Sequence, residues 1–496
     1  MEGKILGLSL TEVVKKQTFG TALERAIAFI SPKTAYKRAQ FRSAYEVLDR
    51  HRTRTKRSTS GGTGDLNLDE HSLTELREIG RDLSRNNPIA IGMLRTETNA
   101  IIGSGPKIEG RSDDETWNEE AEAAFKENYI DKPCDLSGRF NALQLQRIGF
   151  LSYRRDGDAL LIFNEDNLQL AEGEQCGTPY GKQQPDLFDI INGVAYSKQT
   201  GKIIGYYIGK PNKWGYIQQD SWKNFTTDRV HHIFNPERVS FSRGEPALTQ
   251  SIKYIDYLTG YIDAELVAAK VNACFSVFVT KENGDMPDAY TGGVEPSGVD
   301  ESGKRVEKLD PGMVTYLRTG EGVIPVGQTR PGAIFDPFVA RMLAIIGRPL
   351  CLPMMLVTLD FSGATFMNAR IAYQKAQEHW EIEQDFVETP LATRIWLWGL
   401  NRLIEQKQLK NPPEDWFKHE VFCRRWPYVD PYKEAIANEQ ELKNATDTRT
   451  EQCARKGLDF KTVATALGRE KKILKENELL DVTEAKSEIQ RTSSVD

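Results

Sequence analysis

Residues 298–305 read Gly-Val-Asp-Glu-Ser-Gly-Lys-Arg and contain the Gly-x-x-x-x-Gly-Lys frame of a phosphate-binding loop. In such a loop, backbone N–H groups surround the phosphates, and a hydroxyl after the lysine binds magnesium. Here Arg305 stands at the hydroxyl position, and Asp300 and Glu301 place negative charge where phosphates would lie. The flanking residues also indicate neither an apolar strand nor a helix. The frame therefore does not predict a nucleotide site, and the glycines of 177–182 have the wrong spacing for one.

A second glycine pair, Gly103-Ser-Gly105, resembles the beginning of a dinucleotide-binding turn. Ile108 occupies the position of the third glycine, and the pair follows a helical pattern where the turn requires a strand. A glycine directly after a helix and a proline beyond it are typical of a helix end. We therefore expect Gly103 to cap a helix in the left-handed conformation, and Pro106 to prevent the helix from continuing.

The other reactive side chains lack the spacing of a catalytic or metal site. His231 and His232 are adjacent and would point to opposite faces of a strand, and His419 begins only half of the HExxH zinc motif. The six cysteines form no CxxC pair, which favours free thiols. Asp156 and Asp158 are expected in a turn, where aspartate accepts backbone hydrogen bonds. The sequence therefore predicts no catalytic residue, no metal and no cofactor.

Composition limits the remaining classes. A chain of 496 residues exceeds what one hydrophobic core usually covers, so two or more lobes are expected. With 39% hydrophobic and 27% charged residues, and no apolar run long enough for a membrane span, it reads as a soluble protein. The N-terminus lacks the pattern of a signal peptide, which favours an intracellular protein. The net charge of -6 means that any contact with DNA would be local.

The first half of the chain predicts helices followed by a sheet. Residues 37–57 are basic and run into a Gly/Ser segment that indicates a flexible joint; DNA, solvent and an acidic neighbouring subunit are the alternatives for what they contact. A helix is expected from Ser72, with Ser72 as its cap and Glu75 completing a capping box, and another from Pro88 to Gly103. Short β-rich runs between Tyr153 and Ile208 predict a sheet region.

The middle of the chain predicts two helices on either side of a turn-rich excursion. Apolar residues recur at near-heptad spacing over 246–274, where Pro246 would open a long helix. A strand FSVFVTK, a Gly/Pro/Asp-rich stretch and a hairpin around 319–322 follow. A second helix is expected over Phe335–Ile346.

The last part of the chain predicts mostly helix. Leu356–Thr365 is expected as a short loop, and Phe366–Gln408 as one very long helix that Pro390 kinks. Residues 431–480 are charged and helical, with a break at Gly457.

Six segments, in order, resemble the lambda-type portal proteins of tailed bacteriophages. They are RDLSRNNPIAIGMLRTETNAIIGSGPKI, INGVAYSKQTGKIIGYYIG, VHHIFNPERVSFSRGEPALTQSIKYIDYL, DAELVAAKVNACFSVFV, LDPGMVTYLRTGEGV and GRPLCLPMMLVTLDFSGATFMNARIAYQKA. The likeness extends from about residue 72 to residue 470. The sequence departs from the family at 364–368, Ala-Thr-Phe-Met-Asn, where the family more often has Asn-Tyr-Ser-Ser before the Ala-Arg that is kept here as Ala369-Arg370.

The resemblance implies an α+β portal fold with a mixed wing, a long α-helical stem, an α/β clip and a helical C-terminal crown. The implied boundaries are a basic, partly flexible N-terminal arm (1–71), wing (72–245), stem helix (246–274), clip (275–330), second stem helix (331–353), channel or tunnel loop (354–365), kinked wing helix and following segment (366–430), and crown and tail (431–496).

The resemblance also implies a non-enzymatic ring, usually of twelve copies, at one capsid vertex of the virion. Double-stranded DNA would pass through it without sequence specificity during packaging and ejection, and the chain would be made in the host cytoplasm, with no membrane involved. Implied partners are the terminase large subunit, head-tail adaptor proteins, and capsid and scaffolding proteins. The alternatives are a P-loop-like nucleotide-binding enzyme, which the altered frame disfavours, and a minor capsid protein without a channel.

Two sets of site residues follow from the same resemblance. The channel loop would consist of Thr358, Leu359, Asp360, Phe361, Ser362, Gly363, Ala364 and Thr365. The clip residues that would contact the motor or connector are Asp288, Tyr290, Glu295, Asp300, Glu301, Lys304 and Arg305. The channel set contains one carboxylate and no lysine or arginine, so it offers DNA no cation to bind.

Overall fold

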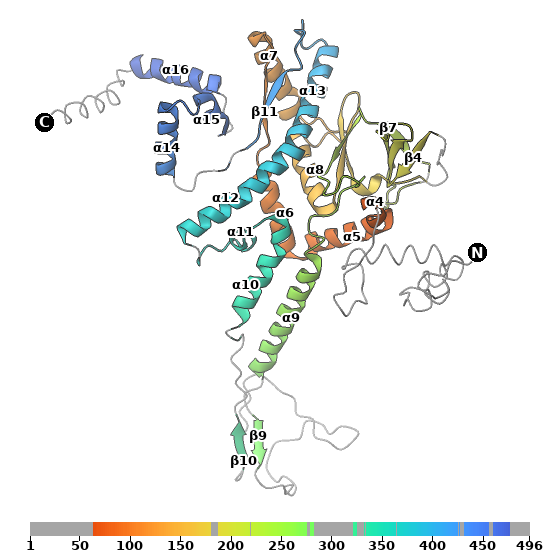
Figure 1. Ribbon diagram of the computed structural model, residues 1–496, viewed down its shortest axis with the longest axis vertical. Coiled ribbons are helices and arrows are strands. Elements are labelled where there is room, and N and C mark those ends of the chain that lie inside the picture. Colours follow the sequence, from red (N-terminus) through yellow and green to blue (C-terminus); the bar gives the residue numbers. More distant parts are fainter. Residues whose placement is uncertain are drawn as a thin grey trace, which may run out of the picture. The chain divides into compact units, whose positions relative to one another are not determined.

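Figure 1 shows a computed structural model of the chain. It describes residues 63–179, 187–218, 220–274, 278–281, 321–324, 332, 334–363, 365–424, 426, 431–455 and 460–476. The chain divides into two compact units, the first formed by Met1–Gln250 and Pro349–Asp496 and the second by Ser251–Arg348. Within the described ranges, none of the helices is both long and apolar enough to cross a membrane.

Helices α4 (Gly64–Asn67), α5 (Glu70–Asn86) and α6 (Pro88–Ile101) begin the first unit. The prediction that Ser72 caps α5 is wrong, because the Asp69 carboxylate accepts the Ser72 N–H at 2.9 Å and starts the helix two residues earlier. The start of α6 at Pro88 is confirmed, with the Asn87 side chain as its cap.

The end of α6 also confirms its prediction. Gly103 has a φ of 57°, in the left-handed region, and its N–H donates to the Thr98 carbonyl at 3.4 Å. The pair Gly103 and Gly105 therefore ends a helix and forms no phosphate cradle.

Three further helical stretches precede the sheets: α7 (Glu115–Phe125), the π-helical η2 (Lys126–Ile130) and α8 (Ala142–Asp156). A capping box between Asn141 and Gln144 starts α8. Because α8 includes Tyr153, the sheet region begins later than predicted, at Ala159.

Two antiparallel sheets form the β-rich part of the first unit. The three-stranded sheet has the order β3–β2–β8, and the four-stranded sheet has the order β4–β5–β6–β7. Their bounds are β2 (Ala159–Phe163), β3 (Leu168–Glu172), β4 (Phe188–Ile191), β5 (Val194–Ser197), β6 (Ile203–Ile208), β7 (Lys223–Thr226) and β8 (Val230–Ile233), with a short 3-10 turn η3 (Gly173–Gln175) after β3. Both sheets contribute to one apolar core, in which Leu160 and Ile162 lie with Val194, Tyr206 and Ile208.

A third pairing joins distant parts of the chain, since β1 (Lys107–Gly110) is antiparallel to β11 (His419–Phe422). After the second unit, the chain returns to the first and reaches β11 through a 3-10 turn η4 (Arg348–Leu350), α11 (Met354–Thr358), α12 (Phe366–Glu383), the π-helical η5 (Gln384–Glu388) and α13 (Thr389–Glu405). The charged C-terminal part forms α14 (Pro431–Lys443), α15 (Arg449–Arg455) and α16 (Phe460–Glu476), and the predicted break at Gly457 lies outside the described residues.

The predicted single helix from Phe366 to Gln408 is wrong in detail. The π-helical turn η5 separates α12 from α13, and α13 ends at Glu405. Pro390 lies in the first turn of α13, where the absence of its N–H destabilises the helix little. The wider π-helical turn η5 before it accommodates the preceding carbonyl that has no N–H donor from Pro390. The kink predicted at Pro390 stays a prediction, and what the structure shows is the π-helical turn η5 directly before α13.

The second unit consists of α9 (Ile252–Cys274), β9 (Phe278–Lys281), β10 (Glu321–Ile324) and α10 (Phe335–Ile346). The bounds of α10 confirm the prediction. The strands pair with each other, Phe278 opposite Ile324 and Lys281 opposite Glu321, whereas the other strand of the predicted hairpin, 313–318, lies outside the described residues.

The predicted start of the long helix at Pro246 is wrong. The N–H and hydroxyl of Thr249 both donate to the Pro246 carbonyl, at 3.0 and 2.6 Å, and close a tight turn. The α-helical ladder begins only at Ile252. Proline can start a helix, but a side chain that bonds this carbonyl competes with the helical pattern.

Candidate functional site

The predicted channel loop connects α11 to α12 in the first unit. The prediction that Leu356–Thr358 are loop is wrong, because they belong to α11, which ends at Thr358. Leu359 follows with a φ of 55°, a left-handed helix end that is unusual for a side chain of this size. The residues from Thr358 to Gly363, and Thr365, are all exposed, and Ala364 lies outside the described residues.

Local hydrogen bonds order this loop around Asp360. Its N–H donates to the Thr358 hydroxyl at 3.2 Å, and its carboxylate accepts the Ser362 N–H at 2.9 Å. The hydrogen bonds from Ser362 lower the pKa of Asp360. Leu359 and Phe361 are 65% and 52% exposed, so the segment presents apolar surface around one fixed negative charge.

The predicted clip residues lie outside the part of the chain that the structure describes. Asp288, Tyr290, Glu295, Asp300, Glu301, Lys304 and Arg305 all come between β9 and β10 in sequence. What the structure describes of this region is the antiparallel pairing of these two strands.

Asp158 is at the centre of a buried charged cluster. Its carboxylate accepts hydrogen bonds from Arg77 at 2.8 Å and from Arg243, and it lies 3.0 Å from His232 Nε2. All four side chains are almost completely buried. The prediction that Asp156 and Asp158 lie in a simple turn is therefore wrong, since Asp156 ends α8 and Asp158 is the common acceptor of this cluster.

The charge states of the cluster follow from this geometry. Burial opposes ionisation of Asp158, but Arg243 and Arg77 hold the pKa of its carboxyl well below its ordinary value. Burial lowers the pKa of His232, although Asp158 acts in the opposite direction. Arg243 also donates to the carbonyls of Cys176 at 2.7 Å and Asn192 at 2.8 Å. The cluster therefore ties α5, β2, β8 and the loops beside both sheets into one scaffold.

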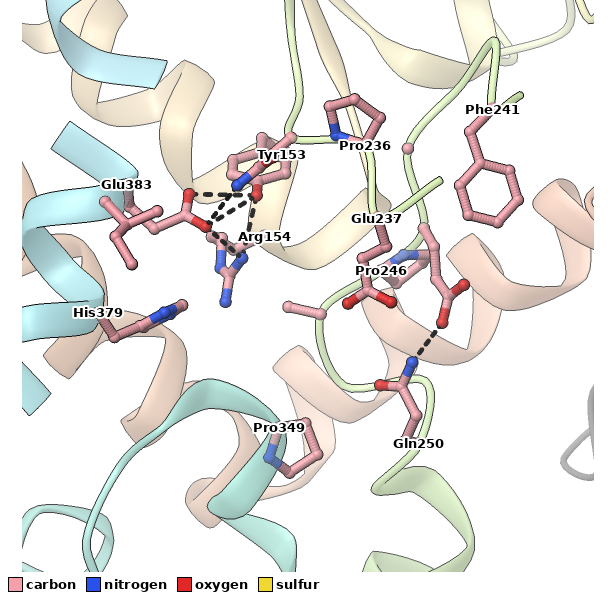
Figure 2. Close-up of a pocket in the computed structure, with 15 residues that line it drawn as sticks. Tyr153, Arg154, Pro236, Glu237, Phe241, Pro246, Gln250, Pro349, His379 and Glu383 are labelled. Carbon is pink, nitrogen blue, oxygen red and sulfur yellow. Dashed lines mark hydrogen bonds and ion pairs between the residues drawn. The ribbon is translucent and has the colours of Figure 1, made fainter. Parts of the chain in front are cut away.

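A second buried cluster lines a cavity of about 280 Å³ in the first unit (Figure 2). Arg154 binds the Glu97 carboxylate through two nitrogens, at 2.7 and 2.9 Å. Glu383 accepts hydrogen bonds from the Tyr153 hydroxyl and the Asn235 amide, each at 3.2 Å. The complete lining is Tyr153, Arg154, Asn235, Pro236, Glu237, Phe241, Gly244, Glu245, Pro246, Ala247, Gln250, Pro349, His379, Ile382 and Glu383.

The buried charged groups that line this cavity are paired with one another, and the cavity presents polar atoms from Tyr153, Asn235 and Glu383. Burial opposes the charge of Arg154, yet Glu97 keeps its pKa above the ordinary value, and burial raises the pKa of Tyr153. Glu97 and Glu383 are already paired inside the protein. Among the described residues, no three His, Cys, Asp or Glu side chains gather to hold a metal ion.

Glu388, at the end of η5, is a buried carboxyl in different surroundings. It is fully buried, and neither oxygen has a conventional hydrogen-bond partner among the described residues. Burial raises its pKa to about 8, with the Cys423 thiol acting weakly in the opposite direction. Glu388 is therefore mostly protonated at neutral pH.

Sequence reasoning missed both clusters. The partners of Asp158 are 81 and 85 residues away in the chain, so no local spacing connects them. The described cysteines 134, 176, 351, 423 and 453 form no disulfide, as predicted.

Comparison with known proteins places the chain among phage portal proteins. The family model described as phage portal protein, lambda family, matches residues 50–384, which is more than half of the chain. The chain therefore belongs to the lambda family of phage portal proteins, and the resemblance of the collinear segments is confirmed. A curated relative, the probable portal protein of Halomonas phage phiHAP-1, is 22% identical over 426 residues, 82% of this chain and 81% of the relative.

Solved structures show a weaker likeness. The neck of an empty gene transfer agent particle, computed with C6 symmetry, matches with a TM-score of 0.42 and 13% identity, over 76% of this chain and 93% of that one. The neck of the native particle, computed with C12 symmetry, matches with a TM-score of 0.42 and 14% identity, over 79% and 94%.

Proposed function

We propose that this portal protein forms a ring, of about twelve copies, at one vertex of a phage capsid, and that the phage DNA enters and leaves through it. Membership of the lambda portal family, over residues 50–384, is the observation that carries the proposal. In the proposed assembly the ring also docks the terminase large subunit and the head-tail adaptors, and it contacts capsid and scaffolding proteins. It performs no catalysis of its own.

The second unit supports a ring, because its helices leave apolar side chains uncovered. Tyr257, Leu266 and Val267 on α9 are exposed, as are Phe338 and Ile345 on α10. A lone soluble chain gains nothing by exposing such a set, whereas neighbouring copies in a ring would bury it. We assign α9 and α10 to the stem and the region between them to the clip.

The α11–α12 loop suits a channel surface. Thr358–Thr365 contains no lysine or arginine, and its only ionised group, Asp360, repels phosphate. Cationic contacts would release counterions from DNA and hold it in place, which a sliding passage has to avoid. In the same scheme, Asp288, Tyr290, Glu295, Asp300, Glu301, Lys304 and Arg305 face the motor or connector, and α14 to α16 form the crown.

Native mass spectrometry combined with negative-stain imaging of the purified full chain tests the proposal. We expect closed oligomers of a single stoichiometry and end-on views with a central hole. Monomers alone, over a range of salt and protein concentration, would contradict the ring. Closed particles without a hole would favour a minor capsid protein that has no channel.

A further inference from the structure

The connection between β6 and β7 forms a small, firmly built hairpin, here called the aromatic tip and defined as Lys210–Ile217. Pro211 and Ile217 form an isolated antiparallel bridge at its base. Beyond the bridge, the Asn212 N–H donates to the Tyr216 carbonyl at 2.8 Å, and the Gly215 N–H donates to the Asn212 carbonyl at 3.0 Å. The backbone of the tip is therefore closed on itself by hydrogen bonds.

The Asn212 side chain completes this scaffold. Its Oδ1 accepts the N–H groups of Trp214 at 2.9 Å and Tyr216 at 3.1 Å. Gly215 has a φ of 88°, a conformation that other residues rarely adopt. The two aromatic residues of the tip are thus fixed through their own backbone groups.

The base of the tip is hydrogen-bonded to the 3-10 turn η3 and to the other arm of the β6–β7 connection. The Gly209 N–H donates to the Gln175 carbonyl at 2.8 Å, and the Lys210 N–H donates to the Ser221 hydroxyl at 3.0 Å. A Cβ on Gly209 would approach Ile217 to 2.2 Å, so the two arms of the connection pass very close together. Such close anchoring limits the conformations that the tip can adopt.

This scaffold holds its aromatic side chains out in solvent. Trp214 is 70% exposed and Tyr216 is 75% exposed. The Lys213 ammonium lies 4.2 Å from the centre of the Trp214 ring, and no carboxylate among the described residues forms an ion pair with Lys210 or Lys213. The tip therefore combines two exposed aromatic side chains, on a hydrogen-bonded backbone, with positive charge. Trp and Tyr in this setting are the residue types that dominate protein interfaces.

We propose that the aromatic tip is a docking site for an acidic protein surface on the capsid shell. The inference rests on the proposed function, because the capsid shell is chosen as the partner from the position of the tip relative to the proposed channel loop. In the view of Figure 1, the four-stranded sheet that carries the tip lies to the right of α6 and α8, and the start of α12, next to the proposed channel loop, lies to their left. If the loop faces the channel, the sheet faces outward, where the shell surrounds a portal.

The chemistry of the tip favours a protein partner over nucleic acid. Lys213 covers one face of Trp214, which hinders stacking of a base on that face. The tip has two lysines and no arginine, and the chain as a whole has a net charge of -6, which repels a polyanion. The shell surface is expected to present carboxylates around an apolar pocket, so that Lys210 and Lys213 gain partners while Trp214 and Tyr216 are buried.

Co-assembly with the capsid and scaffolding proteins encoded with this chain tests the proposal. The number of portal rings per purified shell is measured for the full-length wild type, for the double variant W214A/Y216A, for Lys213→Glu and for Tyr432→Ala. Tyr432 is a matched control, because it is 76% exposed but lies on α14. Native mass spectrometry of each variant reports ring formation separately.

We expect W214A/Y216A to lower incorporation about ten-fold, K213E to lower it less, and Tyr432→Ala to leave it unchanged, with rings formed in every case. Incorporation of the double variant at the wild-type level would overturn the docking site but leave the ring intact. Loss of rings in the double variant would overturn it as well, because the tip would then lie between copies. Loss of binding to a labelled DNA duplex, with incorporation unchanged, would assign the tip to nucleic acid. Failure of the wild type to form rings would contradict the proposed function itself.

Discussion

Asp158 and Asp360 belong to the same unit and both have a lowered pKa, but their surroundings have little in common. Asp158 is fully buried and shares its carboxylate among Arg77, Arg243 and His232. Asp360 is exposed and is held by Ser362 within its own loop. One charge holds distant parts of the chain together, whereas the other remains available at the surface.

Under the proposed function, this difference separates the stability of the fold from the passage of DNA. The buried charges of Arg77, Arg243 and Asp158 are paired with one another inside the first unit, so they are not available to bind DNA. The proposed channel loop has a charge that repels phosphate and that contributes little to the fold, because screening by solvent weakens exposed interactions. Substitution of Asp158 should therefore lower the stability of the fold, whereas substitution of Asp360 should leave it nearly unchanged.

The largest effect is expected for Asp158→Asn. It leaves Arg77 and Arg243 buried without their anionic partner, and breaking a buried pair in this way costs about 3 to 5 kcal/mol. The urea midpoint of unfolding should fall strongly, whereas the matched variant Asp360→Asn should unfold like the wild type. Equal midpoints for D158N and the wild type would show that the buried cluster does not stabilise the fold.

Glu388 sharpens the comparison, because it is buried like Asp158, but no cation from the described part of the chain shifts its pKa. Its pKa in the folded chain is about 8, against 4.5 in the unfolded chain. The folded chain therefore holds this proton more tightly than the unfolded chain. The resulting contribution to the free energy of unfolding is fully present below about pH 4.5 and is lost as the pH rises through about 8.

We expect Glu388→Gln to remove this part of the pH dependence, which is on the order of 4 kcal/mol between about pH 5 and pH 9. Thermal midpoints measured from about pH 5 to pH 9 should decline less for the variant than for the wild type. Glu381→Gln is the control, because Glu381 lies on the exposed surface of α12. Parallel curves for wild type and E388Q would mean that Glu388 has a solvated or paired environment.

Local patterns predicted those parts of the fold that depend on neighbours in sequence. Pro88 and Gly103 mark the beginning and end of α6 through their own backbone preferences, and α10 has the predicted bounds. The start of α9 was missed because the side chain of Thr249 competes for the Pro246 carbonyl. The cluster around Asp158 could not be predicted, because its members come from segments that only the folded chain brings together.

Asp360→Lys tests the exposed side of the comparison. We expect intact rings and a stability within about 0.5 kcal/mol of the wild type, since the side chain is exposed and its carboxylate accepts the N–H of Ser362 in the same loop. DNA passage in an in vitro packaging assay should slow several-fold, because a ring of lysines binds phosphates, and added salt should partly restore it. Asp360→Asn separates loss of the negative charge from gain of a positive one. Packaging at the wild-type rate in D360K would place this loop away from the DNA.

The smallest effect is expected for Lys304→Ala in the isolated ring. Lys304 follows a glycine at the spacing of a phosphate-binding loop, but Asp300 and Glu301 precede it and Arg305 replaces the hydroxyl that would bind magnesium. Asp158 and Asp360 differ in role because their neighbouring groups differ. The neighbours of Lys304 include two carboxylates, which would repel the phosphates of a nucleotide. We expect no magnesium-dependent ATP hydrolysis by the wild type or by K304A. ATP hydrolysis by the wild-type ring that is lost in K304A would show that the Gly-x-x-x-x-Gly-Lys frame binds a nucleotide despite its altered neighbours. It would support the alternative of a nucleotide-binding enzyme.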